Sequence, residues 1–187
     1  MPNPALSGET SSASQSPALP IAHGVLKILM VLNWGLCAFI LALLFVVPAR
    51  IWVLGSFGLP LSTESDRLVK ELIWGMRGIA VCGLATVPLN YVILKRLLAM
   101  VDTVRAGNPF VAANAQRLKE IAWALLGLQL LSITIGAIAD AISTPEHPVH
   151  MDAGFSINGW LAVLLTFLLA RVFAEGTLMR EDLEGTV

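Results

Sequence analysis

Charged side chains are scarce in this sequence, and long stretches of it contain none. Asp, Glu, Lys and Arg make up 13% of the 187 residues, whereas 56% are hydrophobic. Such a chain has too few polar groups to cover the surface of a soluble domain. The net charge is −1, so no overall basic field favours direct binding of nucleic acid. The composition therefore predicts an integral membrane protein that is embedded in the lipid bilayer.

The sequence also lacks the patterns that catalytic, cofactor and metal sites require. Cys37 and Cys82 lie in apolar runs without a histidine nearby, which argues against a disulfide framework and a zinc site. No Gly-rich phosphate loop, nucleophile elbow or HExxH motif occurs. The stretch EHPVHMD, residues 146–152, could hold a transition metal, but its proline fixes no ligand geometry, and an exposed polar loop is the simpler interpretation. We therefore expect no enzyme, no cofactor and no metal site.

Four apolar stretches are long enough to cross a bilayer as helices. A helix rises about 1.5 Å per residue, so about 20 apolar residues span the hydrocarbon core. The first 22 residues contain no Lys or Arg and are rich in Ser, Pro, Ala and Gly, which predicts a disordered tail rather than a secretory signal. We expect an all-α fold, a four-helix bundle that forms one transmembrane domain, residues 23–187, with spans at residues 28–47, 72–94, 121–142 and 154–170.

Lys and Arg are unevenly distributed between the connections, and this predicts the orientation. Residues 143–158 contain neither, so this connection should lie outside the cytoplasm. Both termini are then cytoplasmic, and the connection between the second and third spans is a cytoplasmic helical hairpin. The cytoplasmic side would hold eight of the twelve basic residues, which are Lys27, Lys95, Arg96, Arg105, Arg117, Lys119, Arg171 and Arg180.

The hairpin has the sequence RAGNPFVAANAQRLKEIAW, residues 105–123. Gly107 is placed to end one helix in the left-handed conformation, and Asn114 could cap the next helix. Phe110 and Val111 are expected to pin the turn against its flanking helices or against the membrane surface. Much of the stretch is thereby explained as a connector.

Charge differs between this hairpin and the end of the chain. Residues 95–120 carry five positive and two negative side chains, a net of +3, whereas residues 175–187 carry four acids and one Arg, a net of −3. Under the predicted threading both face the cytoplasm. An acidic tail, residues 175–187, could dock on the hairpin, or both could bind a shared partner; two independent solvated segments are the alternative.

Polar residues also lie within the predicted spans. Gln129, Ser132, Gly136 and Asp140 fall on one face of the third span, where they could join neighbouring helices or line a polar cavity for a small ligand. Arg77 and Asp140 lie toward the outer ends of adjacent spans and could pair, either as a clamp between helices or as a proton-linked gate.

Two motifs resemble a known family. RAGNPFVAANAQRLKEIAW is similar to a pattern G-x-P-F followed by N-x-x-R-L and an apolar span, and ARVFAEGTLMREDLEGTV is similar to an acidic E-D-x-E-G-T-V ending. Both are typical of bacterial membrane proteins of domain-of-unknown-function family 2975, and the resemblance covers residues 25–187. It implies a four-helix inner-membrane protein, often encoded beside small helix-turn-helix regulators, and it carries over no catalytic residues.

We therefore expect a non-enzymatic protein of the bacterial cytoplasmic membrane that binds or sequesters a cytoplasmic protein, such as a small helix-turn-helix regulator. The residues expected to bind this partner are Arg105, Asn108, Pro109, Phe110, Asn114, Arg117, Glu181, Asp182 and Glu184. The alternative is a small-ligand-binding or transporter-like protein that uses Arg77, Gln129, Ser132 and Asp140. Four spans without an internal repeat are few for a transporter, so this alternative would require a homo-oligomer.

Overall fold

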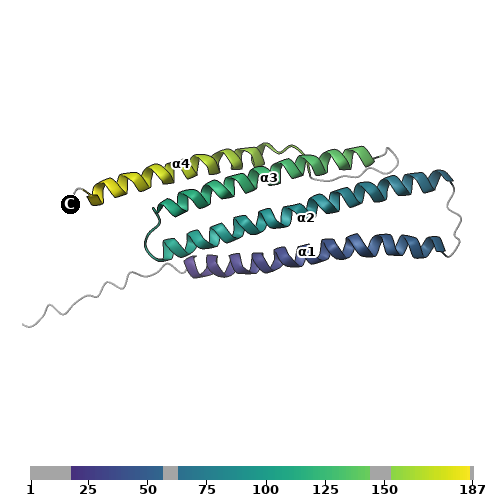
Figure 1. Ribbon diagram of the computed structural model, residues 1–187, viewed down its shortest axis with the longest axis horizontal. Coiled ribbons are helices and arrows are strands. Elements are labelled where there is room, and N and C mark those ends of the chain that lie inside the picture. Colours follow the sequence, from purple (N-terminus) through teal and green to yellow (C-terminus); the bar gives the residue numbers. More distant parts are fainter. Residues whose placement is uncertain (1–17, 57–62, 144–152, 186–187) are drawn as a thin grey trace, which may run out of the picture.

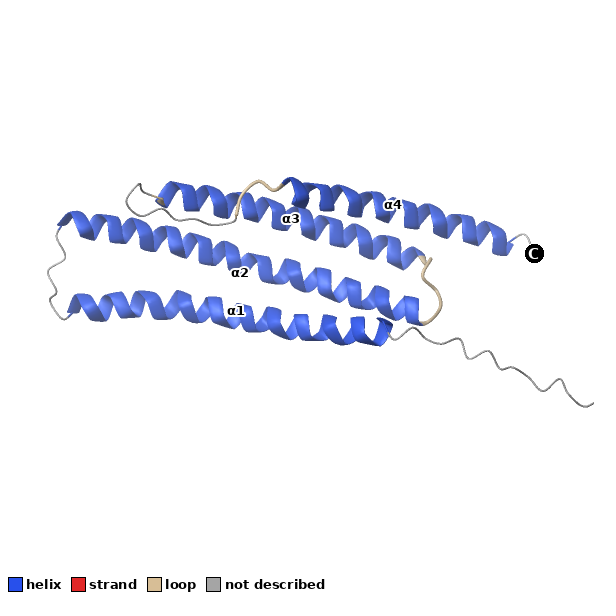
Figure 2. Cartoon of the chain, turned by 180° about the vertical axis from the view of Figure 1, so that it is seen from behind, coloured by secondary structure: helices blue, strands red, loops and turns tan. Residues whose placement is uncertain are grey.

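Four long helices lie side by side in the computed structural model, each antiparallel to the next one in the chain (Figures 1 and 2). The structure describes residues 18–56, 63–143 and 153–185, and these residues contain helices and no strand. The helices are α1 (Ala18–Ser56), α2 (Thr63–Arg105), α3 (Ala112–Ile142) and α4 (Ile157–Gly185). The predicted all-α fold is confirmed.

Each of these helices contains a stretch that is long and apolar enough to cross a bilayer. Among the described residues the four stretches are Leu19–Val46, Ile73–Arg105, Ala112–Ile142 and Ile157–Leu183. Their length and composition make the chain a multi-pass membrane protein. The predicted spans are found in the same order.

Most helix ends differ from the boundaries of the predicted spans, and only the end of α3 at Ile142 agrees. α1 begins at Ala18, so residues 18–22 are helical and do not belong to a tail. α4 begins at Ile157, after the predicted start of the fourth span, and continues to Gly185. Residues 175–185 are therefore the last turns of α4 rather than a separate tail. The reason is that Glu, Leu, Met and Arg are strong helix formers, so the loss of apolar character does not end the helix.

The helices form a row in which each packs only on its neighbour in the chain. α1 contacts α2, α2 contacts α3, and α3 contacts α4, while the described residues of other helix pairs make no contact. α1 and α4 therefore form the two edges of the row (Figure 1). Most buried apolar side chains belong to α3, among them Leu118, Ile121 and Ala122. Many large apolar side chains of all four helices are exposed, as suits a surface that faces lipid.

One end of the row carries the α2–α3 connection, residues 106–111, together with the start of α1 and the end of α4. We call it the turn end. α4 is displaced along α3 toward this end, so it extends past the first residue of α3 (Figure 1). At its other end α4 begins part-way along α3, and residues 153–156 lie beside α3 without helical structure.

α1 is joined to α2 by a buried polar side chain. Asn33, the polar residue within the first predicted span, is 7% exposed, and its Nδ2 donates a hydrogen bond to the carbonyl oxygen of Val87 at 3.1 Å. Val87 itself is buried and directly precedes Pro88, through which α2 continues unbroken. Since the surrounding side chains and lipid are equally apolar, this hydrogen bond helps to fix the position of α1 along α2.

Replacement of Asn33 by Ala should weaken the packing of α1 on α2. We expect a loss of about 0.5–2 kcal/mol in the free energy of unfolding, the usual range for a hydrogen bond between membrane helices. Denaturant titration of the purified chain in detergent micelles measures it. Asn158→Ala is the matched control, because Asn158 is exposed on the first turn of α4. Equal stability of the two variants would show that the Asn33 contact does not hold the helices.

Candidate functional site

α2 ends in a regular left-handed cap. Gly107 has a φ of +80°, and its N–H bonds to the carbonyl oxygen of Val104 at 3.0 Å. The N–H of Asn108 reaches back to the carbonyl oxygen of Thr103 at 3.1 Å. These two bonds form a Schellman motif, which satisfies carbonyls at the helix end and requires a residue that tolerates positive φ. The predicted role of Gly107 is confirmed.

Asn114 has a different role from the predicted cap. The residue that caps α3 is Val111, which makes no side-chain hydrogen bond, whereas Asn114 lies within the first turn and is completely buried. Its Nδ2 donates to Thr103 Oγ1 and to the carbonyl oxygen of Pro109, both at 2.8 Å. A side chain in the first turn of a helix can point back under the turn, so Asn114 ties α2, the connection and α3 together.

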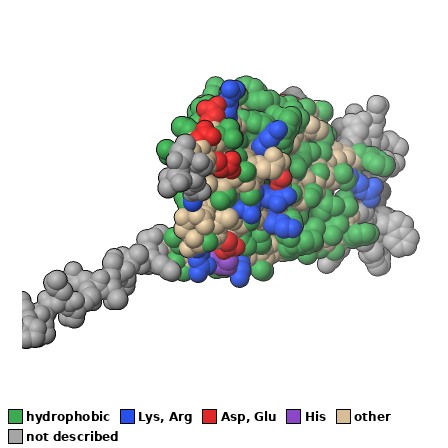
Figure 3. Space-filling model, turned by 60° about the vertical axis from the view of Figure 1, so that its left-hand side comes forward, with side chains coloured by type: hydrophobic (Ala, Val, Ile, Leu, Met, Phe, Trp, Pro, Cys, Tyr) green, Lys and Arg blue, Asp and Glu red, His purple; other side chains and the backbone are tan. Residues whose placement is uncertain are grey.

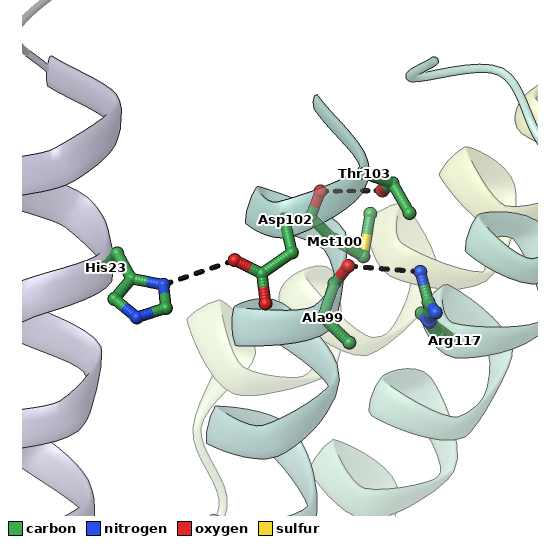
Figure 4. A network of polar contacts seen from close by, with 6 residues as sticks. All are labelled: His23, Ala99, Met100, Asp102, Thr103 and Arg117. Atoms are coloured by element: carbon green, nitrogen blue, oxygen red, sulfur yellow. Dashed lines mark hydrogen bonds and ion pairs between the residues drawn. The ribbon is translucent and has the colours of Figure 1, made fainter. Parts of the chain in front are cut away.

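Arg117 also points into the protein. Its Nη1 donates to Asn114 Oδ1 at 2.7 Å and to the carbonyl oxygen of Ala99 at 3.1 Å, a contact that Figure 4 shows. Arg117 lies one turn after Asn114 on the same face of α3, which turns it toward α2. It therefore holds the turn in place and does not form part of an exposed basic surface.

Two further charged contacts lie at the turn end. Arg96 of α2 pairs with Glu120 of α3. His23 Nδ1, which is buried and has no hydrogen-bond partner, lies 3.2 Å from Asp102 Oδ1, so α1 and α2 would form an ion pair here when the imidazole is protonated (Figure 4). The sequence suggested no partner for His23, because Asp102 is remote in the chain and lies close only once the helices are antiparallel.

The end of α4 packs beside the α2–α3 turn. The rings of Phe110 and Phe173 lie 5.3 Å apart, and Phe110 also faces Gly176, where an added Cβ would be 3.4 Å from the ring. Arg180 Nη2 donates to Asn108 Oδ1 at 3.4 Å. Phe110 thus packs the turn against α4, which is not one of the two helices that flank the turn, and aromatic packing makes the contact.

Residues of the turn and of the end of α4 line a common hollow. The hollow has a volume of about 230 Å³ and is lined in part by Asn108, Phe110, Arg180 and Glu181. Arg105, three residues before Asn108, and Asp182, next to Glu181, are both exposed, and Pro109 is half-buried. Figure 3 shows basic and acidic side chains gathered at this end of the molecule, with hydrophobic side chains over the rest of that view. The side chain of Glu184 lies outside the described residues. We call this surface, made of Arg105, Asn108, Phe110, Glu181 and Asp182, the turn surface.

Backbone fills the space beside the polar stripe of α3. Ser132 Oγ contacts both the carbonyl oxygen and the N–H of Gly154 at 3.2 Å, and Gln129 Nε2 donates to the carbonyl oxygen of Ser156 at 3.5 Å. A Cβ added at Gly136 would lie 2.9 Å from the carbonyl oxygen of Ala153. Through these contacts the stripe holds residues 153–156 and the start of α4 against α3.

Arg77 and Asp140 are not paired in the structure. The guanidinium of Arg77 lies over the ring of Trp74, 5.4 Å from its centroid, and Asp140 is exposed. Within the described residues no ion pair joins them, so the expected clamp or gate is not formed. The cation–π contact with a residue on its own helix gives the Arg77 charge a local partner.

Comparison with known protein families identifies one match. A family described as protein of unknown function, DUF2975, matches residues 59–187. The chain belongs to the DUF2975 family. The match covers α2, α3 and α4, whereas the resemblance was expected to begin at residue 25 and so to include α1. No curated protein and no solved structure matches the chain.

DUF2975 membership brings no catalytic residues with it. The described residues contain no group of three or more His, Cys, Asp or Glu side chains that could hold a metal ion. The stretch EHPVHMD, residues 146–152, lies outside the described residues. The turn surface is the candidate site of this DUF2975 protein.

Asn114→Ala should destabilise the protein, because it leaves Pro109, Thr103 and Arg117 without their shared partner. Loss of a buried, fully bonded polar group costs about 2–4 kcal/mol. Chemical denaturation in detergent measures the change in the free energy of unfolding. Asn108→Ala removes the same group from an exposed position and should cost less than about 0.5 kcal/mol. Similar losses at both positions would contradict the role assigned to Asn114.

Gly136→Ala and Gly35→Ala should change stability in opposite directions. A Cβ at residue 136 meets backbone atoms of residues 153 and 154, so the connection must shift at a cost of about 1–3 kcal/mol. At Gly35, on α1, nothing lies within 4 Å, so the better helix propensity of Ala should stabilise by up to about 1 kcal/mol. Thermal unfolding of both variants in one detergent measures the difference. A neutral Gly136→Ala would mean that the space beside the stripe is open.

Proposed function

We propose that this protein is a non-enzymatic component of a bacterial cytoplasmic membrane and that its turn surface binds a protein partner. The partner that the family resemblance suggests is a small helix-turn-helix regulator, which would be held at the membrane. The turn end faces the cytoplasm in this proposal, with both termini on that side, because Lys and Arg are concentrated there.

One observation carries the proposal: the packing of Phe110 on Phe173 and Gly176 joins two segments that are distant in the sequence. The exposed groups of the turn and of α4 are therefore held in a fixed arrangement. A preformed surface loses less conformational entropy on binding than two independent segments would lose. This favours specific recognition over loose electrostatic attraction.

The composition of the turn surface fits a protein interface. Phe110 remains 45% exposed although its ring packs on α4, so an aromatic face is available to a partner. Arg105 lies on one side of it in the chain and the acids Glu181 and Asp182 lie on α4, which gives the rim charges of both signs. An aromatic anchor inside a charged rim is the usual arrangement of residues that dominate binding energy. Asn114 and Arg117, which were expected to contact the partner, support this surface from inside.

Binding of a neighbouring regulator tests the proposal. The full chain in lipid nanodiscs is immobilised, and the purified helix-turn-helix protein encoded beside its gene is passed over it. Phe110→Ala removes the exposed ring and should weaken binding more than about tenfold, since truncation of such an anchor costs at least about 2 kcal/mol. Arg105→Glu should slow association, because it reverses a charge on the rim.

Lys27→Glu is the control, because Lys27 is an exposed basic residue of α1, at the opposite edge of the row from α4. It should leave the affinity unchanged within about twofold. Equal effects of Lys27→Glu and Arg105→Glu would indicate general attraction to a basic membrane protein. Absence of binding to the unmodified chain would reject the regulator as partner.

A further inference from the structure

A second and larger hollow lies between α3 and α4. It runs along the two helices, between residues 112–119 of α3 and residues 167–181 of α4. Its volume is about 540 Å³, and the small side chains of Ala112, Ala115, Ala170 and Ala174 line much of it. Phe167 lies at one end of this groove and Glu181 at the other. Because alanine side chains are too short to fill the space between the surfaces of the two helices, a narrow apolar groove remains along them.

Two basic side chains stand at the same height on either side of the groove. Lys119 of α3 and Arg171 of α4 both line it. The two helices are antiparallel, and the rings of Trp123 and Phe167 meet edge to face at 5.5 Å. Lys119 precedes Trp123 by four residues and Arg171 follows Phe167 by four, so each cation lies one helical turn from this aromatic pair, toward the turn end.

The nitrogen atoms of both cations are largely available. Arg171 Nε donates to Glu175 Oε1 at 3.1 Å, and Nη1 and Nη2 can still donate to a ligand. Lys119 is exposed and has no hydrogen-bond or ion-pair partner among the described residues. Glu175, which offsets part of the Arg171 charge, does not line the groove, and Glu181, which does, is ten residues from Arg171, about 15 Å along the helix.

We propose that the groove between α3 and α4 binds an anionic phospholipid, with its phosphate held between Lys119 and Arg171. The acyl chains lie along the apolar side, past Phe167 and Trp123. Three features select a lipid over a soluble anion. The two cations are level, the aromatic pair lies one turn deeper as in the interfacial belt of membrane proteins, and the groove leads into the apolar spans of both helices. Trp123 is 58% exposed beside the groove, so a chain can contact its ring.

Native mass spectrometry of the purified full chain tests this, with phosphatidylglycerol and phosphatidylcholine as probes at equal concentration. The unmodified protein should retain one phosphatidylglycerol in preference to phosphatidylcholine. Lys119→Gln or Arg171→Gln should weaken retention about fivefold each, and the double variant about 30-fold, which corresponds to about 1 kcal/mol for each cation. Lys119→Arg should retain the lipid, because it keeps the charge.

Lys27→Gln is the matched control, since it removes one exposed positive charge from the same end of the row and leaves the groove intact. Retention of phosphatidylglycerol should not change in this variant. Circular dichroism of each variant checks that the helices are intact.

The proposal would be overturned if Lys27→Gln lost as much phosphatidylglycerol as Lys119→Gln does, or if the unmodified protein retained the two lipids equally. Displacement of the lipid by about 10 mM inorganic phosphate would identify a soluble-anion site instead. If the double variant changes the mass of an oligomer and leaves lipid retention as it was, a second copy occupies the groove and the proposal fails.

Discussion

The hydrogen bonds of one buried side chain, Asn114, determine the shape of the turn end. An asparagine offers two donors and one carbonyl acceptor, and here each is directed to a different segment: Thr103 before the turn, Pro109 within it and Arg117 after it. Because the group is completely buried, a turn of another shape would leave these atoms without partners. The α2–α3 connection also sets the position of Phe110, and Phe110 packs on α4. The arrangement of the whole turn surface therefore follows from a contact that a partner could not touch.

Polar contacts between neighbours also explain how a row of membrane helices keeps its register. Apolar side chains gain little by leaving lipid for one another, so apolar packing alone discriminates poorly between positions along a helix. In this protein each adjacent pair has a polar contact. Asn33 joins α1 to α2, the Asn114 cluster joins α2 to α3, and Gln129 with Ser132 joins α3 to the start of α4. Together they fix a row in which α1 and α4 remain apart.

The sequence predicts the elements of this fold better than their ends and contacts. Hydropathy is a local property, so it locates four spans, and the positive φ of Gly107 follows from a local motif. The end of α4 lies beyond the predicted span because helix-forming residues continue past its apolar stretch. The roles of Asn114 and Arg117 could not be predicted, since they depend on which face of α3 meets α2. The contact of residues 153–156 with α3 could not be predicted either. Gly136 is small enough for a backbone segment to pack against it, but the sequence does not indicate which segment does so.

The net charge of a segment is a poor guide to what it can bind, and the turn end shows why. The sequence gives residues 95–120 five basic side chains, but Arg96 is paired with Glu120 and Arg117 is directed at Ala99 and Asn114. Lys95 lies over the ring of Tyr91, 6.0 Å from its centroid. Arg105 and Lys119 remain, and they belong to different places, the turn surface and the groove between α3 and α4. The basic side chains of this segment are thus divided between internal contacts and two separate surfaces, and the contact of the turn with the end of α4 is made by Phe110 with Phe173 and by Arg180 with Asn108.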